Sequence, residues 1–153
     1  MVIYSSNGGM SSIFERKDNV MIWNEQYETG NELVDSEHKE LFSLVRGVLQ
    51  DSEDEKREKI EESIDFLIKY TVLHFQHEEA LMDECNYPES AEHKKLHDEF
   101  AKTAVSLKER FAKKGDAVEL GTQINTVVCE WLIKHVLNSD KKLATYYKNF
   151  KTT

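Results

Sequence analysis

Five of the six histidines fall where the inner faces of amphipathic helices are otherwise apolar, and this placement constrains the fold more than any other feature. Two carboxylates accompany them, one on the same faces and one just beyond the last. The seven residues are His38, His74, Glu78, His93, His97, His135 and Asp140. A buried imidazole or carboxylate costs several kcal/mol unless a partner satisfies it. The chain must therefore fold so that these groups converge, and a metal best satisfies all seven.

Composition and charge favour one helical domain and argue against nucleic acid and membranes as partners. One proline and six glycines in 153 residues leave long uninterrupted segments. A net charge of −9 repels phosphate backbones, and no apolar run approaches the roughly 18 residues of a membrane helix, so we expect no nucleic acid and no membrane contact. We predict a flexible N-terminal extension over 1–20 and one domain over 21–153. Because 1–20 lacks signal-peptide features, we expect a cytoplasmic protein in which Cys85 and Cys129 are reduced packing residues.

Apolar residues at steps of three and four predict four long helices. Asp35 or Ser36 is the expected cap of the first helix, whose inner face begins at His38. Asp116 is the expected cap of the fourth, which extends to His135.

The second and third helices are predicted over about 55–85 and 88–113, with a break before Pro88, which suits the first turn of the third. A short C-terminal helix over about 143–150 is expected to fold back on the others. Short connections favour antiparallel neighbours, so we predict an all-α protein with an up-down-up-down antiparallel four-helix bundle.

The spacing of the inward polar residues favours a metal site with more than one ion. His74 and Glu78 are four residues apart, as are His93 and His97, so each pair shares a helix face. Five imidazoles and two carboxylates exceed the four ligands of a zinc site, and they suit two ions bridged by carboxylates. Asp140 is five residues after His135, which is off the direction of a regular helix. Either the helix loosens near this point or the side chain reaches around.

Other interpretations of single residues favour ordinary packing or solvation. One inward histidine is usually a hydrogen-bonded core residue, but five on four helices are not independent accidents. His77 lies on the flank of its stripe and is expected to be solvated, and Glu79 is expected at the surface. Packing alone would explain several large apolar residues, namely Trp23, Phe75, Met82, Trp131 and Leu132.

Taken together, these residues resemble the hemerythrin family, and most of all the single-domain bacteriohemerythrins. The resemblance covers about 21–150 and includes all seven inward polar residues. Its motifs are Trp23, Asp35-Ser36-Glu37-His38-Lys39-Glu40-Leu41-Phe42, His74-Phe75-Gln76-His77-Glu78-Glu79 through Met82, Tyr87-Pro88, His93, His97, Trp131-Leu132, His135 and Asp140.

The resemblance implies a non-haem di-iron centre that binds dioxygen. It implies that His93, His97 and His135 hold one iron and that His38 and His74 hold the other. It further implies that Glu78 and Asp140 bridge the two ions together with an oxo or hydroxo group, and that dioxygen takes a vacant position on the two-histidine iron. By the same resemblance, an oxygen pocket is lined by Leu41, Phe75, Leu132 and Val136.

The function expected from the resemblance is reversible dioxygen binding, for oxygen storage, transport or delivery to an oxygen-using enzyme. Two alternatives remain open. One is an oxygen or redox sensor module, although such domains are usually fused to signalling segments and the 20-residue extension is too short to be one. The other is a di-iron enzyme that reacts with peroxide or nitric oxide, although the apolar pocket offers no acid or base beyond the ligands.

Overall fold

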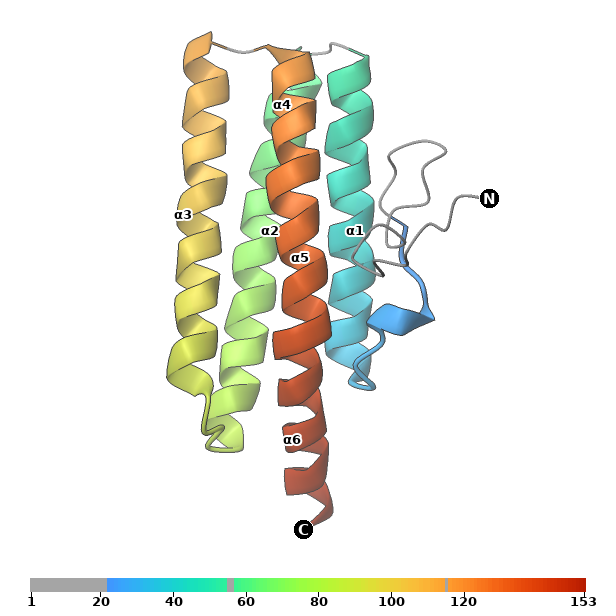
Figure 1. The fold of residues 1–153 in the computed structure, drawn as a ribbon, viewed down its shortest axis with the longest axis vertical. Coiled ribbons are helices and arrows are strands. Elements are labelled where there is room, and N and C mark those ends of the chain that lie inside the picture. The colour runs from blue at the N-terminus through green and yellow to red at the C-terminus, as the bar shows by residue number, and fades with distance from the viewer. Residues whose placement is uncertain (1–21, 55–56, 115) are drawn as a thin grey trace, which may run out of the picture.

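The computed structural model describes residues 22–54, 57–114 and 116–153, and in these residues all regular structure is helical. Four long rods lie side by side (Figure 1). The first three are α1 (Glu32–Glu53), α2 (Arg57–Glu84) and α3 (Ser90–Lys114). The fourth rod is continuous and contains α4 (Ala117–Gln123), a π turn (Ile124–Cys129), α5 (Glu130–His135), a second π turn (Val136–Asp140) and α6 (Lys141–Thr152). A short 3₁₀ turn (Glu25–Tyr27) precedes α1.

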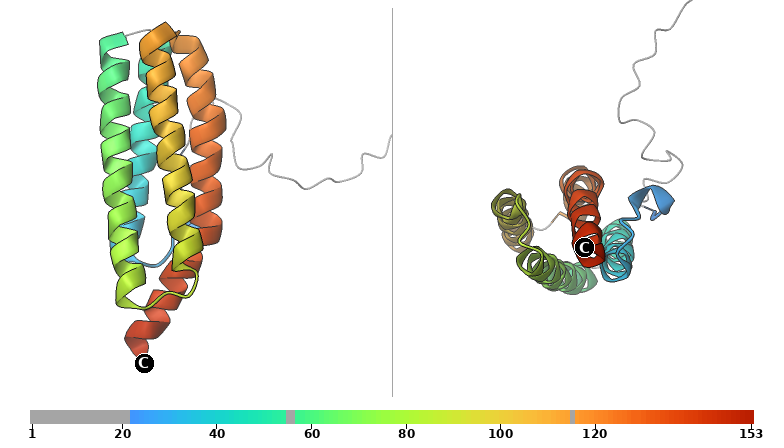
Figure 2. Two further views of the ribbon diagram at one scale, coloured as in Figure 1. Left: turned by 90° about the vertical axis from the view of Figure 1, so that its left-hand side faces the viewer. Right: turned by 90° about the horizontal axis from the view of Figure 1, so that it is seen from below.

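The rods alternate in direction along the chain, which confirms the predicted up-down-up-down bundle. Seen along the bundle, α1 lies next to α2 and to the fourth rod, and α3 completes the square (Figure 2). The C-terminal helix is confirmed as well, but it does not fold back. Instead α6 continues the fourth rod past the end of the bundle (Figure 1). Its Leu143 is 1% exposed because it packs in a second apolar cluster with Met82, Cys85 and Tyr87.

The start of α1 differs from the prediction because a different side chain caps the helix. The Oδ1 atom of Asn31 accepts the backbone N–H of Val34 at 3.1 Å, so the helix begins before Asp35 and Ser36. The Asp35 carboxylate instead accepts the backbone N–H and the hydroxyl of Thr29, at 2.7 and 2.8 Å. Asp35 therefore holds the loop before α1, and Ser36 lies within the first turns of the helix.

The predicted break between the second and third helices is confirmed. Asn86 adopts a left-handed backbone with φ of 51°, and the N–H of Tyr87 donates to the carbonyl of Met82 at 2.9 Å, which ends α2. Helix α3 begins at Ser90, whose N–H donates to the carbonyl of Tyr87. Pro88 therefore lies in the turn rather than in the first turn of α3, because the chain needs these residues to reverse its direction.

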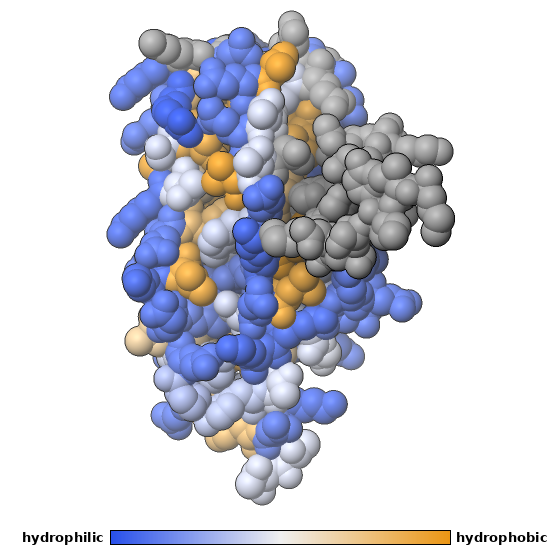
Figure 3. Space-filling model, in the orientation of Figure 1, coloured by the Kyte–Doolittle hydropathy of each residue, from blue (hydrophilic) through white to orange (hydrophobic). Residues whose placement is uncertain are grey.

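The apolar stripes of the four rods pack into one core that extends along the bundle. Both cysteines are buried and free, as expected for packing residues. The face seen in Figure 3 is mainly hydrophilic, with separate apolar side chains between the charged ones. In the part of the chain that the structure describes, no helix is long and apolar enough to span a membrane. The predicted extension over 1–20 lies outside the described residues.

Candidate metal centre

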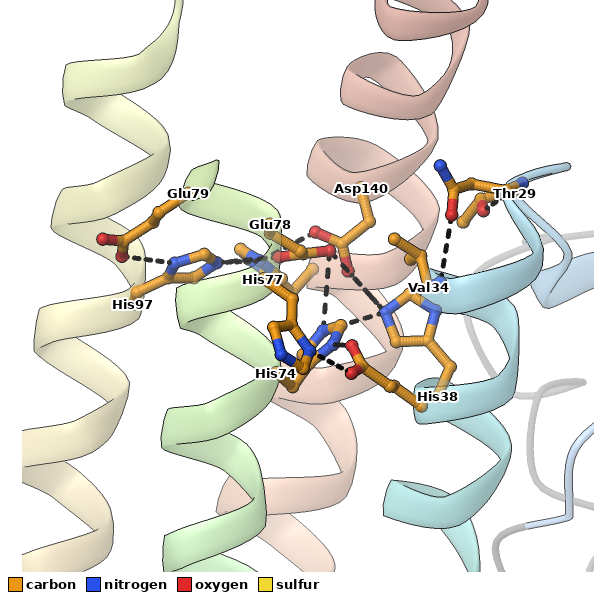
Figure 4. A network of polar contacts seen from close by, with 12 residues as sticks. Thr29, Val34, His38, His74, His77, Glu78, Glu79, His97 and Asp140 are labelled. Atoms are coloured by element: carbon orange, nitrogen blue, oxygen red, sulfur yellow. Dashed lines mark hydrogen bonds and ion pairs between the residues drawn. The ribbon is translucent and has the colours of Figure 1, made fainter. Parts of the chain in front are cut away.

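The seven polar residues singled out from the sequence converge in the core, near the end of the bundle where α1 begins and α2 ends. None of them is more than 4% exposed. One comes from α1, two from α2, two from α3, one from α5 and one from the second π turn. In Figure 4, Glu78 and Asp140 lie in the middle, between His97 on one side and His38 on the other.

The five imidazoles form two separate groups. In the first, the Nε2 atoms of His38 and His74 are 3.2 Å apart. In the second, the Nε2 atom of His135 lies 3.0 Å from that of His93 and 3.1 Å from that of His97. Every histidine of the site therefore turns its Nε2 atom inward. The Nε2 atoms of His38 and His74 converge on one point, and those of the other three histidines converge on a second point.

The two carboxylates span both groups. Glu78 places Oε1 3.5 Å from Nε2 of His74 and Oε2 3.1 Å from Nε2 of His97. Asp140 places Oδ2 3.0 Å from Nε2 of His38 and Oδ1 2.9 Å from Nε2 of His135. Each carboxylate thus turns one oxygen to the two-histidine group and the other to the three-histidine group. This is the arrangement that two bridging ligands need.

The donor atoms of the site are better satisfied by two cations than by hydrogen bonds among themselves. Both oxygens of Glu78 are buried and lie close to imidazole nitrogens, yet neither accepts a hydrogen bond. A fully buried carboxylate without such bonds is costly unless a cation satisfies it. Two sets of atoms lie close enough to share an ion each, with Glu78 and Asp140 in both sets. Imidazole nitrogen with carboxylate oxygen suits iron and other transition metals.

A π turn explains how Asp140 reaches the centre. Over Val136–Asp140 the backbone widens, and the N–H of Lys141 donates to the carbonyl of Val136, five residues earlier. The extra residue in this turn returns Asp140 to the face of His135. The side-chain amide of Asn138 donates to the carbonyl of Lys134 at 2.8 Å and so satisfies a carbonyl in the last turn of α5, just before the π turn. Of the two predicted alternatives, the loosened helix is the one observed.

Comparison with known proteins identifies the family. A model of the hemerythrin HHE cation-binding domain matches residues 29–147. This chain belongs to the hemerythrin family. It is 28% identical over 120 residues to a bacteriohemerythrin of Pseudomonas aeruginosa, which covers 78% of this chain and 76% of that protein. It is 32% identical to a hemerythrin-like protein of Naegleria gruberi, over 78% of this chain and 87% of that one.

The fold agrees with solved hemerythrin structures. A crystal structure of wild-type hemerythrin superposes with a TM-score of 0.75 at 26% identity, and the match covers 84% of this chain and 98% of that one. The sequence-based expectations of family and fold are therefore confirmed.

Two glutamates that the sequence analysis did not assign anchor this hemerythrin-family centre from behind. Glu37 is 6% exposed, and its Oε2 accepts from Nδ1 of His74 at 2.8 Å. Glu79 accepts from Nδ1 of His97 at 3.1 Å through Oε1. Such outer partners fix the ring and make its other nitrogen a better ligand. The side chain of Glu79 is 33% exposed, so this residue lies partly at the surface, as predicted, and also holds the ring of His97.

His77 is also more than the solvated histidine that was expected. Its side chain is 39% exposed, and its Nδ1 bonds to Oε1 of Glu37. Glu37 thus connects a half-exposed imidazole to the buried His74. Glu37 adjoins His38 in the sequence and Glu79 adjoins Glu78, and this adjacency is the signal that could have drawn attention to them. No spacing rule, however, links either glutamate to a histidine on a different helix.

Burial and mutual proximity shift the pKa values of the site strongly. Burial and the charge of Asp140 raise the pKa of Glu78 to about 7. Burial and the charges of His135 and His93 lower the pKa of His97 to about 2. For His93 burial acts downward, but the neighbouring carboxylates of Asp140 and Glu78 outweigh it and raise the pKa to about 9. A cation that binds His93 therefore has to displace a proton, whereas His97 is already neutral near pH 7.

Aromatic and aliphatic side chains enclose the ligands. The ring of Phe75 stacks on His97 with centroids 3.8 Å apart, and Trp131 stacks on His135 at 4.3 Å. The four residues expected around an oxygen pocket are all buried in the main core, at 5% exposure or less. They are Leu41, Phe75, Leu132 and Val136. Trp23 covers the outer side, with its ring 6.2 Å from that of His38.

Proposed function

We propose that this protein binds dioxygen reversibly at a pair of iron ions, for oxygen storage, transport or delivery to an oxygen-using enzyme. The observation that carries the proposal is the division of the two carboxylates, because Glu78 and Asp140 each present one oxygen to each histidine group. The family supports it, since the chain matches the hemerythrin HHE cation-binding domain over 29–147 and is similar to proteins named bacteriohemerythrin.

The proposed ligands are the seven converging residues. His38 and His74 hold one ion, and the three-histidine group holds the other, with Glu78 and Asp140 between them. The unequal division leaves the two-histidine ion one protein ligand short. An iron pair held by these residues would supply the two electrons and the open position that dioxygen binding needs.

The surrounding side chains keep the site dry and rigid. Leu41, Phe75, Leu132 and Val136 are apolar, so they admit a small neutral gas and disfavour water and anions. These four residues carry no acid or base, which favours carriage over turnover. Glu37 and Glu79 hold one ring in each half of the centre in a fixed orientation.

Metal analysis and gas exchange test the proposal directly. The protein should contain two iron ions per chain. The reduced protein should take up oxygen and release it under vacuum, with return of the original optical spectrum. His74→Ala should lose one iron before the other, because it removes half of the imidazoles of the two-histidine group. Two irons retained in that variant would contradict the role of His74, and oxidation without a stable oxygenated form would argue for sensing or turnover.

A further inference from the structure

A cavity of about 140 Å³ adjoins the metal centre, between the corner that joins α2 to α3 and the second π turn. Its rim carries exposed polar side chains, and a proposed metal ligand lies in its wall. The residues that matter here are Glu89, Glu92, His93, Asn138, Ser139 and Lys142. The cavity therefore extends from the surface to a residue of the centre itself.

His93 is the part of the cavity that belongs to the metal centre. It is 3% exposed, and its Nε2 faces His135 and Asp140 at 3.0 and 3.1 Å. Its other ring nitrogen, Nδ1, is buried without a hydrogen-bond partner. His74 and His97 differ, because a glutamate anchors the Nδ1 atom of each. No such anchor holds the His93 ring, so this ligand is the freer one to turn toward the cavity.

The rim offers the chemistry that attracts a hydrated divalent cation. Glu89 and Glu92 are exposed carboxylates, and Asn138 and Ser139 add neutral oxygen atoms. Oxygen donors bind such cations while the cations keep part of their water. Lys142 Nζ lies 3.7 Å from Oε2 of Glu89 and moderates the negative charge at the rim. The rim is therefore acidic but does not chelate tightly, so a divalent cation would pass through it rather than stay bound there.

The walls of the cavity contain two segments that are not regular α-helix. One is the turn before α3, which carries Glu89, and the other is the π turn Val136–Asp140. Widening the cavity there breaks fewer helical hydrogen bonds than separating two rods would. Ser139 is also adjacent to Asp140 in the chain, so the rim and a bridging ligand are one residue apart.

We propose that this cavity is the route by which a divalent cation reaches the metal centre. Glu89 and Glu92 draw the hydrated ion to the rim, and His93 is the first ligand to replace its water. Asp140 then receives the ion through Oδ1, which lies 3.1 Å from Nε2 of His93. The inference rests on the proposed function only in requiring that the centre binds metal.

The rate of metal uptake tests this route. Full-length protein stripped of metal by a chelator is mixed with Co²⁺ at low ionic strength, and the visible bands of the bound ion are followed by stopped flow. The double variant Glu89→Gln/Glu92→Gln should take up Co²⁺ about fivefold more slowly, because rim charge steers the ion. Lys142→Glu should take it up faster by a similar factor. Both should finish with two ions per chain and the spectrum of the wild type.

Matched variants at distant positions separate local steering from net charge. Glu62→Gln/Glu109→Gln removes two exposed carboxylates from the other half of the bundle, and Lys102→Glu reverses one exposed lysine on α3. These variants should keep the uptake rate of the wild type, and added salt should abolish the differences at the rim.

Equal rates in all variants, or equal changes at the rim and at the distant positions, would overturn the route. Failure of the wild type itself to bind metal would overturn the proposed function as well. A slow rim variant that fills completely would leave that function intact.

Discussion

At the scale of single residues, the two ring nitrogens of each buried histidine have different roles. The Nε2 atoms of all five buried histidines face the centre, whereas the Nδ1 atoms decide how firmly each ring is held. Glu37 holds His74 in the two-histidine half, and Glu79 holds His97 in the other half. Because a carboxylate behind a ligating imidazole fixes its orientation and raises its basicity, these glutamates should tune the metal as strongly as some ligands.

Replacement of Glu37 by glutamine tests this role. Glu37→Gln should weaken metal binding in the two-histidine half by about 10- to 100-fold, because the amide is a poorer acceptor for Nδ1–H of His74. Titration with a competing chelator measures both affinities. Glu40→Gln, an exposed position on the same helix, is the control and should leave both affinities unchanged. If Glu37→Gln retained the affinity of the wild type for both ions, the positioning role would be wrong.

A polar side chain at Leu132 should shorten the life of the oxygenated protein. Leu132 is 4% exposed and lies in the core beside the ligands, so Leu132→Asn brings a group that retains water near the centre. The rate of spectral decay in air should rise several-fold. Leu120→Asn, at a buried position near the other end of the bundle, is the control. Both variants should lose about 2–5 kcal/mol of stability, but only the first should change the decay rate. Equal decay rates would place the oxygen pocket elsewhere.

At the scale of secondary-structure elements, the second π turn is the feature on which the centre depends. A regular helix would turn Asp140 away from His135, and the wider turn brings it back. The first π turn, Ile124–Cys129, lies above the site in the same rod, and nothing in its contacts explains why the rod widens there. Irregular turns thus occur twice in the rod that carries both His135 and Asp140.

Insertion of one alanine after Asn138 tests the π turn. The turn already absorbs one extra residue, so a second one should rotate Asp140 by about 100° away from His135. The insertion variant should keep most of its helical circular dichroism but should no longer hold two ions, as metal analysis would reveal. Asn138→Ala keeps the length of the turn and should still hold both ions. An insertion variant with two ions per chain would mean that the register of this turn does not place the bridge.

At the scale of the whole molecule, the bundle has two ends with different sources of stability. Away from the metal centre, α1, α2, α3 and α4 pack through apolar residues such as Val48, Ile60, Phe111 and Leu120, which need no ligand. Near the centre, five imidazoles and two carboxylates occupy the same interior. Without cations, the two carboxylates repel each other and the imidazoles compete for protons. Metal binding should therefore stabilise the fold as well as enable its function.

Removal of metal should lower the stability of the bundle without unfolding it. A ligand present at a thousand times its Kd contributes about 4 kcal/mol, which for a chain of this size raises Tm by roughly 10 °C. Thermal unfolding followed by circular dichroism, with and without a chelator, measures the difference. Mg²⁺ is the control, because it prefers oxygen ligands and should not restore the stability. An unchanged Tm after chelation would show that the seven groups are satisfied without a cation.

The helical periods and the inward placement of the ligands were predictable because both are local properties. Residues three and four apart share a helix face whatever surrounds the helix, so His74 with Glu78 and His93 with His97 could be paired from spacing alone. The order of the rods followed from short connections. The assignment of ions to histidines came from the family resemblance, and it is consistent with the two groups in the core but remains a proposal.

Other features depend on how the rods are rotated and shifted against one another, which local periodicity does not encode. The start of α1 was misplaced because Asn31 and Asp35 are both good caps, and Asp35 is used instead to bind Thr29. The role of Glu37 appeared only when α1 was placed beside His74 on α2. The position of Asp140 required an irregular turn, which lets the carboxylate reach His38 on α1 and His93 on α3. Contacts between distant segments, rather than local preference, chose among these locally equivalent alternatives.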